Sequence, residues 1–356
     1  MKFLNIRSFC CWTFIFLWFV WVGVSLVTSA AAQDKPKDSK EKSTAEPKET
    51  TQEEKPRGKS ALSVQVRLIN LEITVSDKKG NLITGLKSDN FTVYEDNVRQ
   101  EITNFAPVEA PITVVLVIDY SRIAYRLGWN FFGNEIWDAM YEFTRTLRKG
   151  DWAAVVAYDM RPEILTDFTQ DQRKVHDALR RINTPAFSES NLADAVSFVL
   201  ERVEEIEGKP AVILLSTGLD TFSKVTYDFA LKKTQNTNAV IYSVGIGQSN
   251  RMRQEPYMRG ETSIEFSQAD NRLRSLSEYS GGAAFFPRFT SEFRNIFADI
   301  SARLRHMYSL GYVSSNTKKD GKFRKIRVEV NANVAGHGKS EKLKVAHRKG
   351  YIAPKE

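Results

Sequence analysis

The chain has 356 residues and a hydrophobic share of 42%, which is enough for about two packed domains and excludes a fully disordered protein. Charged residues make up 26%, which argues against a polytopic membrane protein, and a formal net charge of +8 without a basic cluster gives no indication of nucleic-acid binding. Both cysteines, Cys10 and Cys11, lie in an N-terminal apolar run, so the remaining sequence excludes a disulfide framework, a zinc–thiolate site and a cysteine nucleophile.

The amino terminus predicts export. Lys2 and Arg7 precede an unbroken apolar or small-residue run over 9–27, and three consecutive alanines end at Ala32. This pattern is typical of a signal peptide over residues 1–32 that is cleaved near Ala32. An uncleaved anchor is the alternative, because the run is about long enough to cross a bilayer. In either case we expect an extracytoplasmic protein, secreted or periplasmic, that contacts a membrane only if the segment is retained.

Residues 33–60 form a second distinct segment. Lys, Glu and Asp alternate there with Pro, Ser and Thr, and aromatic residues are absent. Such a composition buries too little apolar surface to offset the entropy of ordering the chain. We therefore predict a disordered charged linker.

Alternating apolar and polar residues, which are typical of half-buried strands, flank the central part of the chain on both sides. The predicted strands before it lie within 62–75, 91–94 and 102–105, and those after it at 308–313, 323–330 and 343–347. Three strands on each side are too few to be stable separately. We therefore predict that 61–110 and 307–356 combine into one small antiparallel β-sandwich.

The central residues 111–306 show a different pattern. Residues 112–118 (ITVVLVI) form a continuous apolar, mostly β-branched run, typical of a strand buried on both faces of a parallel sheet. Further apolar strands at 153–158, 211–215 and 239–244 alternate with segments of helical spacing. This alternation predicts a doubly wound, mostly parallel α/β domain inserted into the β-sandwich.

Oxygen-bearing side chains follow the predicted parallel strands. Asp119 and Ser121 follow the first strand, Ser190 precedes a helical pattern, and Thr217 and Asp220 follow a later strand. Ligands bind outside the carboxyl ends of the strands in open parallel sheets, so we expect these three loops to meet at one edge.

The three loops resemble the von Willebrand factor type A domain. That family has an Asp-x-Ser-x-Ser motif, a Thr at a helix start and an Asp after a later strand, which together form a metal-ion-dependent adhesion site. Here Ile123 stands where the second Ser belongs, and Thr217 replaces the later Asp. The resemblance implies a degenerate site that would hold Mg²⁺, Mn²⁺ or Ca²⁺ through oxygen ligands. Its ligands would be Asp119, Ser121, Ser190, Thr217 and Asp220.

From about Leu62 to Pro354 the chain is similar to a von Willebrand factor A-related family described from acidobacteria. The segments that carry this similarity are 83–86, 89–93, 215–221, 280–282, 308–313, 320–325 and 349–351. The resemblance implies an exported protein with the α/β fold predicted above.

Several simpler interpretations remain open at this edge. Asp119 could accept hydrogen bonds from loop amides without an ion, or a guanidinium from Arg122 or Arg126 could take the place of the cation. Ser190 could be a helix N-cap. Residues 248–270 form a long insertion, which is either a binding loop or an ordinary surface loop. The aromatic residues Trp129, Phe131 and Phe132 are either a partner surface or helix packing.

The residues therefore predict a non-catalytic binding module that recognises a protein or an extracellular matrix ligand. The alternative is a metal-free structural scaffold of a bacterial envelope complex. A serine hydrolase is a remote alternative, because it needs a histidine beside Ser121 or Ser216. The histidines fall elsewhere in the pattern, at His176, His306, His337 and His347.

Overall fold

The computed structural model describes residues 68–107, 111–182, 187–206, 210–254, 260–331 and 343–355. They all belong to one compact unit, Ser63–Glu356. The segments predicted as a signal peptide and a linker, and the predicted strand residues Val64 and Val66, lie outside the described residues. Within the described ranges, none of the helices has the length and hydropathy needed to cross a bilayer.

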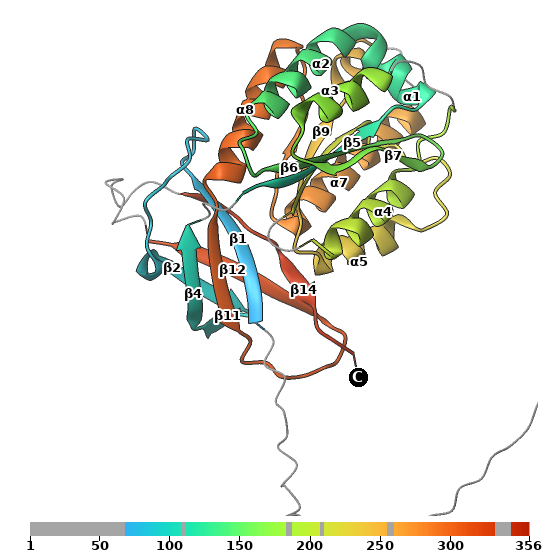
Figure 1. Ribbon diagram of the computed structural model, residues 1–356. Coiled ribbons are helices and arrows are strands. Elements are labelled where there is room, and N and C mark those ends of the chain that lie inside the picture. Colours follow the sequence, from blue (N-terminus) through green and yellow to red (C-terminus); the bar gives the residue numbers. More distant parts are fainter. Residues whose placement is uncertain are drawn as a thin grey trace, which may run out of the picture. The chain divides into compact units, whose positions relative to one another are not determined.

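Two four-stranded antiparallel sheets form a β-sandwich (Figure 1). One sheet has the order β13–β1–β11–β4 and consists of β1 (Leu68–Ser76), β4 (Ile102–Pro107), β11 (Tyr308–Val313) and β13 (Lys344–Ala346). The other has the order β14–β12–β2–β3 and consists of β2 (Phe91–Glu95), β3 (Val98–Gln100), β12 (Phe323–Val330) and β14 (Gly350–Ile352). The short 3₁₀ helix η1 (Ser88–Asn90) precedes β2. Both sheets combine strands from the two flanks of the chain, which confirms the predicted sandwich.

The sandwich core is largely apolar, and it contains the buried carboxylate of Glu95. Leu71, Val93 and Leu310 are fully buried between the sheets. Glu95 in β2 is 2% exposed and accepts hydrogen bonds from Tyr312 at 2.8 Å and Tyr351 at 3.1 Å. A buried carboxylate is tolerated because hydroxyl donors satisfy it. These bonds tie the C-terminal strand β14 and β11 to β2.

A six-stranded sheet with the order β10–β9–β8–β5–β6–β7 lies between the two flanks in sequence. Its strands are β5 (Thr113–Asp119), β6 (Trp152–Tyr158), β7 (Pro162–Thr169), β8 (Pro210–Ser216), β9 (Val240–Gly245) and β10 (Ala284–Phe285). All neighbours are parallel except β6 and β7. The mostly parallel α/β class predicted from the apolar strands is confirmed.

Helices cover both faces of this sheet (Figure 1). Alternate residues of β5 face opposite clusters: Val114 and Leu116 pack with α2, α3 and α8, whereas Val115 and Val117 pack with α4, α5 and α7. The helices are α2 (Asn130–Arg145), α3 (Gln172–Arg181), α4 (Leu192–Glu204), α5 (Tyr227–Asn236), α7 (Gly260–Ser280) and α8 (Ser291–Arg305). Three shorter segments lie near one edge, namely α1 (Arg122–Ala124), the π-helical turn η2 (Tyr125–Trp129) and α6 (Gln248–Gln254).

The start of β5 and the end of α8, where the chain enters and leaves the α/β domain, are held together by Asp151. Its Oδ1 accepts a hydrogen bond from the Ile112 amide at 2.8 Å, and its carboxylate forms an ion pair with Arg305. Burial alone would raise the pKa of Asp151, but the Arg305 hydrogen bond and two backbone N–H donors outweigh burial and lower it. Asp151 therefore forms a charged clamp at the base of the domain.

The structure differs from the sequence predictions in four places, one of which is the short strand β10 (Ala284–Phe285), which was not predicted. Each flank contributes four described strands rather than three, because β3 and β14 are only three residues long and show too little alternation. β7 was not predicted, since all of its residues are partly exposed at the sheet edge. The insertion predicted as a loop over 248–270 is largely helical, with α6 and the first turns of α7 in it. The residue boundaries predicted for the five segments of the chain stay predictions.

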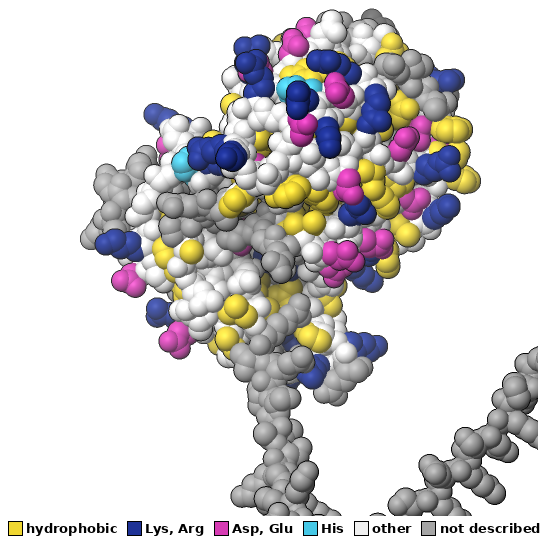
Figure 2. All heavy atoms as spheres, viewed as in Figure 1, with side chains coloured by type: hydrophobic (Ala, Val, Ile, Leu, Met, Phe, Trp, Pro, Cys, Tyr) yellow, Lys and Arg dark blue, Asp and Glu magenta, His cyan; other side chains and the backbone are white. Residues whose placement is uncertain are grey.

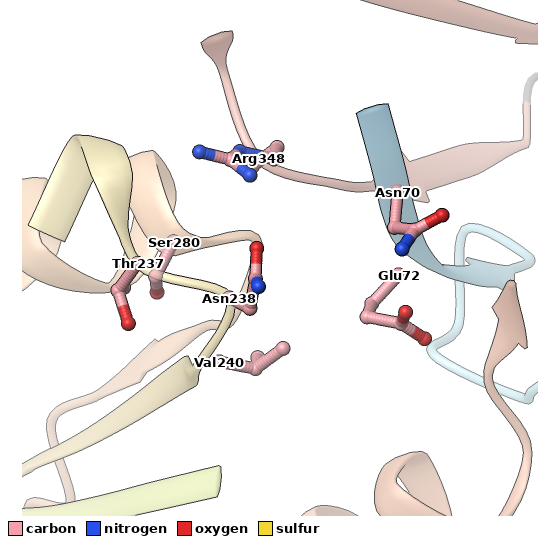
Figure 3. Close-up of a pocket in the computed structure, with 7 residues that line it drawn as sticks. All are labelled: Asn70, Glu72, Thr237, Asn238, Val240, Ser280 and Arg348. Atoms are coloured by element: carbon pink, nitrogen blue, oxygen red, sulfur yellow. The ribbon is translucent and has the colours of Figure 1, made fainter. Parts of the chain in front are cut away.

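A small polar cavity lies where β1 of the sandwich approaches the start of β9 (Figure 3). Its volume is about 60 Å³, and its lining residues are Asn70, Glu72, Thr237, Asn238, Val240, Ser280 and Arg348. Arg348 donates to the carbonyl oxygens of Gln235 at 2.6 Å and of Gly350 at 3.2 Å. This volume suits a few water molecules and is well below that of an organic-ligand pocket. The cavity is part of the junction between the β-sandwich and the α/β domain.

Candidate functional site

The three oxygen-bearing loops meet at the carboxyl edge of the six-stranded sheet. Asp119, the last residue of β5, accepts hydrogen bonds from the hydroxyls of Ser121 at 2.7 Å, Ser190 at 3.0 Å and Thr217 at 3.0 Å. Its oxygens also accept the backbone N–H groups of Ser121 at 3.2 Å and Thr217 at 3.3 Å. The spatial convergence expected from the strand order is therefore present, and Asp119 is its centre.

Asp119 and its three hydroxyl donors are completely buried. Desolvation by burial raises the pKa of Asp119, although the hydrogen bonds from Ser121, Thr217 and Ser190 act in the opposite direction. Burial together with the nearby Asp119 charge also raises the pKa of Tyr158 well above its ordinary value, and its hydroxyl donates to Ser216 at 2.7 Å. The centre is thus an enclosed, fully hydrogen-bonded network.

Asp220 does not join this network. Its carboxylate accepts the backbone N–H groups of Ala193 at 3.2 Å and Ser223 at 3.3 Å, so it fastens the β8–α5 connection to the start of α4. Ser190 is not the N-cap of α4, because that position is Asn191 and has no side-chain capping bond. The N-cap interpretation of Ser190 is therefore wrong, and its hydroxyl donates a hydrogen bond to Asp119 instead.

Gly218 is required where the β8 loop passes under α7. Its φ of +75° favours glycine, and a Cβ there would lie 2.4 Å from the carbonyl oxygen of Ala269. The backbone of this loop is therefore fixed against α7, next to Thr217.

The oxygen atoms of this centre do not fit a divalent cation as they are arranged. A hydroxyl has one proton and two lone pairs. Those of Ser121 and Thr217 give the proton to Asp119 and also accept the N–H groups of Ala124 and Leu219. Asp119 is the one carboxylate in the cluster, and Ile123 supplies hydrocarbon where the related motif has a hydroxyl. The centre therefore offers a cation a single carboxylate, and the hydroxyls of Ser121 and Thr217 already use both their proton and a lone pair within the protein. Among the described residues, no group of three or more His, Cys, Asp or Glu side chains is placed to hold a metal.

The guanidinium that lies beside the centre comes from the insertion over 248–270 and not from the loop after β5. Arg122 and Arg126 are both exposed, so the hypothesis that one of them replaces the cation is wrong. Arg251 of α6 is buried instead. It donates to the Thr217 carbonyl at 2.5 Å, forms an ion pair with Asp270 at 2.7 Å, and lies 4.4 Å from the centre of the Phe266 ring.

Arg251 links the insertion to the centre of the site. Burial lowers its pKa, and the neighbouring Asp270 carboxylate raises it. Since Thr217 donates to Asp119 and accepts from Arg251, the chain Asp119–Thr217–Arg251–Asp270 forms one connected network. Both residues lie in the insertion over 248–270 that the sequence indicated, but only the fold reveals that they pair with each other and that Arg251 reaches Thr217.

Arg251→Met should therefore lower the free energy of unfolding by about 2–3 kcal/mol, because it leaves Asp270 and the Thr217 carbonyl without their cationic partner. Methionine retains helix propensity and apolar bulk. The measurement is equilibrium unfolding in urea. Arg145→Met is the matched control, since its ion pair with Glu142 is exposed and should contribute less than about 0.5 kcal/mol. Equal losses in the two variants would contradict the role assigned to Arg251.

Trp129, one of the three aromatic residues after β5, packs inside the protein. Trp129 is 8% exposed, stacks on Trp137 with ring centres 4.9 Å apart, and donates from Nε1 to the Asp119 carbonyl at 2.7 Å. This outcome supports helix packing over a partner surface for Trp129, while the side chains of Phe131 and Phe132 lie outside the description. Tyr257, Met258 and Arg259 of the insertion lie outside it as well.

The described histidines lie away from the centre. His176 lies 2.8 Å from the Thr144 hydroxyl, and His347 lies against the Arg348 carbonyl at 2.7 Å. His306 follows the last turn of α8, and His337 lies outside the described residues. In the part of the chain that the structure describes, Ser121 and Ser216 have no histidine hydrogen-bond partner, so the geometry offers no support for the hydrolase alternative.

Residues 114–220 match the profile of the von Willebrand factor type A domain. The matched range begins in β5, ends at Asp220 and includes all five predicted site residues. No curated protein matches the chain. The similarity to the acidobacterial family therefore stays a prediction.

Several solved structures are similar to part of the chain. The von Willebrand factor domain of the type V pili tip protein Mfa5 from Porphyromonas gingivalis is 16% identical with a TM-score of 0.43, and the match covers 55% of this chain and 97% of that one. BatB from Bacteroides thetaiotaomicron is 13% identical with a TM-score of 0.42, covering 54% and 98%. The proximal thread matrix protein 1 of the mussel byssus, with zinc in its adhesion-site motif, is 15% identical with a TM-score of 0.43, covering 60% and 50%. At these identities the likeness concerns the fold alone.

Proposed function

We propose that the protein is a non-catalytic binding module that recognises a protein or matrix ligand with the loops at the carboxyl edge of the six-stranded sheet. The observation that carries this proposal is the joining of three separate loops on the buried Asp119. Loops fixed in this way present a preorganised surface, which reduces the entropy cost of binding a partner.

We call the loops at this carboxyl edge the rim. In this proposal five side chains organise the rim and do not coordinate an ion, namely Asp119, Ser121, Ser190, Thr217 and Asp220. The hydroxyls donate to Asp119, and Asp220 fixes the adjoining loop through backbone N–H groups. Partner binding is then independent of Mg²⁺, Mn²⁺ and Ca²⁺. The N-terminal residues 1–32 direct the chain out of the cytoplasm, and 33–60 separate the folded part from the leader.

Blocking the rim should abolish partner capture. We would replace Cys10 and Cys11 by serine, introduce Ser188→Cys in the exposed loop before Ser190, and attach a maleimide-linked polyethylene glycol. The full chain is then used to capture partners from an envelope extract. The labelled protein should lose the captured proteins that the unlabelled protein retains, and addition of a chelator should change nothing.

The same label at Lys318→Cys provides the matched control, because this residue is exposed on the connection between β11 and β12 of the sandwich. Capture that survives the label at position 188 but is lost with the label at position 318 would reject the rim and favour a scaffold that binds through the sandwich. Loss of capture with chelator alone would reject the metal-independent version.

A further inference from the structure

The short connection between β13 and β14 runs from one sheet of the sandwich to the other. β13 pairs with β1 in the first sheet, and β14 pairs with β12 in the second. Both are edge strands of their sheets. The connecting residues His347, Arg348 and Lys349, which we call the crossover, therefore join the two sheets at their edges.

The crossover is also a contact between the sandwich and the α/β domain. A Cβ on Gly281, at the end of α7, would lie 2.6 Å from the Arg348 backbone nitrogen, so the two backbones are in close contact. Arg348 donates to the Gln235 carbonyl near the end of α5 at 2.6 Å. Figure 3 shows Arg348 between β1 and the α/β residues Thr237 and Ser280. Any loosening of the crossover therefore loosens this junction.

One edge of β12 is satisfied by the crossover where β14 no longer accompanies it. The β14 pairing ends at Lys325. The Ile326 N–H then donates to the Lys349 carbonyl at 2.8 Å, and the Val328 N–H donates to Nε2 of His347 at 3.3 Å. N–H groups two residues apart point to the same side of a strand. The imidazole thus takes the place of a ladder carbonyl.

These contacts require one protonation state of His347. Nε2 accepts the Val328 N–H, so it carries no proton. Nδ1 then holds the ring proton and donates to the Arg348 carbonyl at 2.7 Å. A protonated imidazole has N–H groups on both nitrogens. Its Nε2–H would face the Val328 N–H, and two donors would meet without an acceptor between them.

The surroundings of His347 favour its neutral form. Burial lowers the pKa of the imidazole, the hydrogen bond to the Arg348 carbonyl raises it, and the Lys349 charge lowers it again. The net shift is downward with all neighbouring charges in place. The charged side chains on the adjoining elements are Lys344 of β13, Glu72 of β1, Arg327 and Glu329 of β12, and Glu278 of α7.

We propose that His347 is a pH-sensitive latch, which holds the crossover to β12 when neutral and releases it when protonated. On protonation the Val328 N–H loses its acceptor and opposes the new Nε2–H. The crossover then leaves β12, and the contact of Arg348 with α5 loosens with it. The α/β domain would be held firmly on the sandwich at neutral pH and loosely in acid. This inference is independent of the rim and of the proposed function.

The direction of the pH effect follows from proton linkage. Since the pKa is lowered in the closed state, the released state binds more protons. The latch is therefore complete above the ordinary histidine value of about 6.5 and weakens as pH falls below it. One pH unit below that value, protonation should favour the released state by up to about tenfold.

The tautomer is tested by nitrogen NMR on the full-length chain labelled with ¹⁵N-histidine. The chain has four histidines, and the His347 signals are those that disappear in His347→Gln. At about pH 7.5 the proton should lie on Nδ1, with Nε2 unprotonated. This measurement uses the wild type, so a proton on Nε2 at that pH would overturn the inference even if the variant did not fold.

Hydrogen exchange tests the release itself. After correction for the intrinsic rate, the backbone amides of Ile326, Val328 and residues 350–352 should exchange up to about tenfold faster at about pH 5.5 than at about pH 7.5. His347→Gln keeps an acceptor oxygen that cannot be protonated, so these amides should lose this pH dependence. His347→Leu removes the acceptor, and the same amides should exchange fast at both pH values.

His306→Gln is the matched control. His306 is exposed at the end of α8, where Figure 2 shows a histidine side chain at the surface. This variant should keep the wild-type pH response. A pH response that persists in His347→Gln, or one that is lost in His306→Gln, would reject His347 as the latch. The rim-blocking experiment is carried out at neutral pH, where the latch is closed, so its outcome decides the proposed function separately.

Discussion

Asp119→Ala should lower the free energy of unfolding by about 2–4 kcal/mol, because it removes the acceptor shared by three hydroxyls and two backbone N–H groups. All of these donors are buried, and the Thr217 N–H cannot rotate toward another acceptor. Asp119→Asn should cost less than Asp119→Ala but still about 1–3 kcal/mol, because it keeps one acceptor oxygen and turns the other into an N–H donor that faces a buried backbone N–H. Equilibrium unfolding in urea gives both values.

The pH dependence of the two proteins provides a second readout. Because burial raises the pKa of Asp119, the folded protein keeps a proton that the unfolded chain has already lost. Wild-type stability should therefore fall as pH rises from about 3.9, the ordinary aspartate value, through the raised folded value, and Asp119→Asn should lack this component. Asp151, whose pKa is lowered, contributes the opposite slope to both proteins and cancels in the comparison.

Asp177→Ala serves as the control for carboxylate removal, because its ion pair with Arg180 is 70% exposed on both sides and should contribute less than about 0.5 kcal/mol. An Asp119→Ala variant as stable as this control would mean that Asp119 is not the centre of the loop network. A stability difference between wild type and Asp119→Asn that does not change with pH would contradict the raised pKa.

The second large effect should appear when Ile123→Ser and Thr217→Asp are combined. Without a divalent ion the added carboxylate lies beside Asp119 in a buried centre, so the variant should be less stable than the wild type by about 2–4 kcal/mol. With Mg²⁺ at roughly a hundred times its dissociation constant, binding to the folded state should restore about 2.7 kcal/mol. Thermal unfolding with Mg²⁺, Mn²⁺ or chelator measures this recovery.

The wild type under the same conditions is the reference for the double variant. Its unfolding temperature should not respond to Mg²⁺, Mn²⁺ or chelator, because the hydroxyls of Ser121 and Thr217 already donate hydrogen bonds to Asp119. Ile123→Ser alone restores one hydroxyl without the second carboxylate and should respond little. A wild-type transition that rises with Mg²⁺ would show that these residues do ligate an ion.

The buried parallel strands and the rim could be predicted because the apolar pattern of the strands and their order along the chain are visible in the sequence. The apolar run at 112–118 required a strand covered on both faces, and strand order alone placed Asp119, Ser190 and Thr217 at one edge. The two sheets of the sandwich followed from strands too few to be stable apart. These inferences needed only periodicity and topology.

Other features leave no recognisable pattern in the sequence around the residues that form them. β7 and β14 lack a clear apolar alternation, because one is partly exposed and the other only three residues long. The pairing of Arg251 with Asp270 and Thr217 depends on how α6 folds back over the rim. The bond from the Val328 N–H to His347 could not be foreseen either, since it depends on where the crossover between the two sheets of the sandwich lies.

Under the proposed function, the clamp at Asp151 has a mechanical consequence once a ligand is bound. It joins the start of β5 to the end of α8, so both covalent routes out of the α/β domain leave from one point. Tension applied at the carboxyl edge of the six-stranded sheet is shared between β5 and α8 before it reaches the sandwich. There the two routes continue into β4 and β11, which are hydrogen-bonded neighbours in one sheet. A pull on a captured ligand would thus load β4 and β11 together from the same end, and neither flank of the chain would carry it alone.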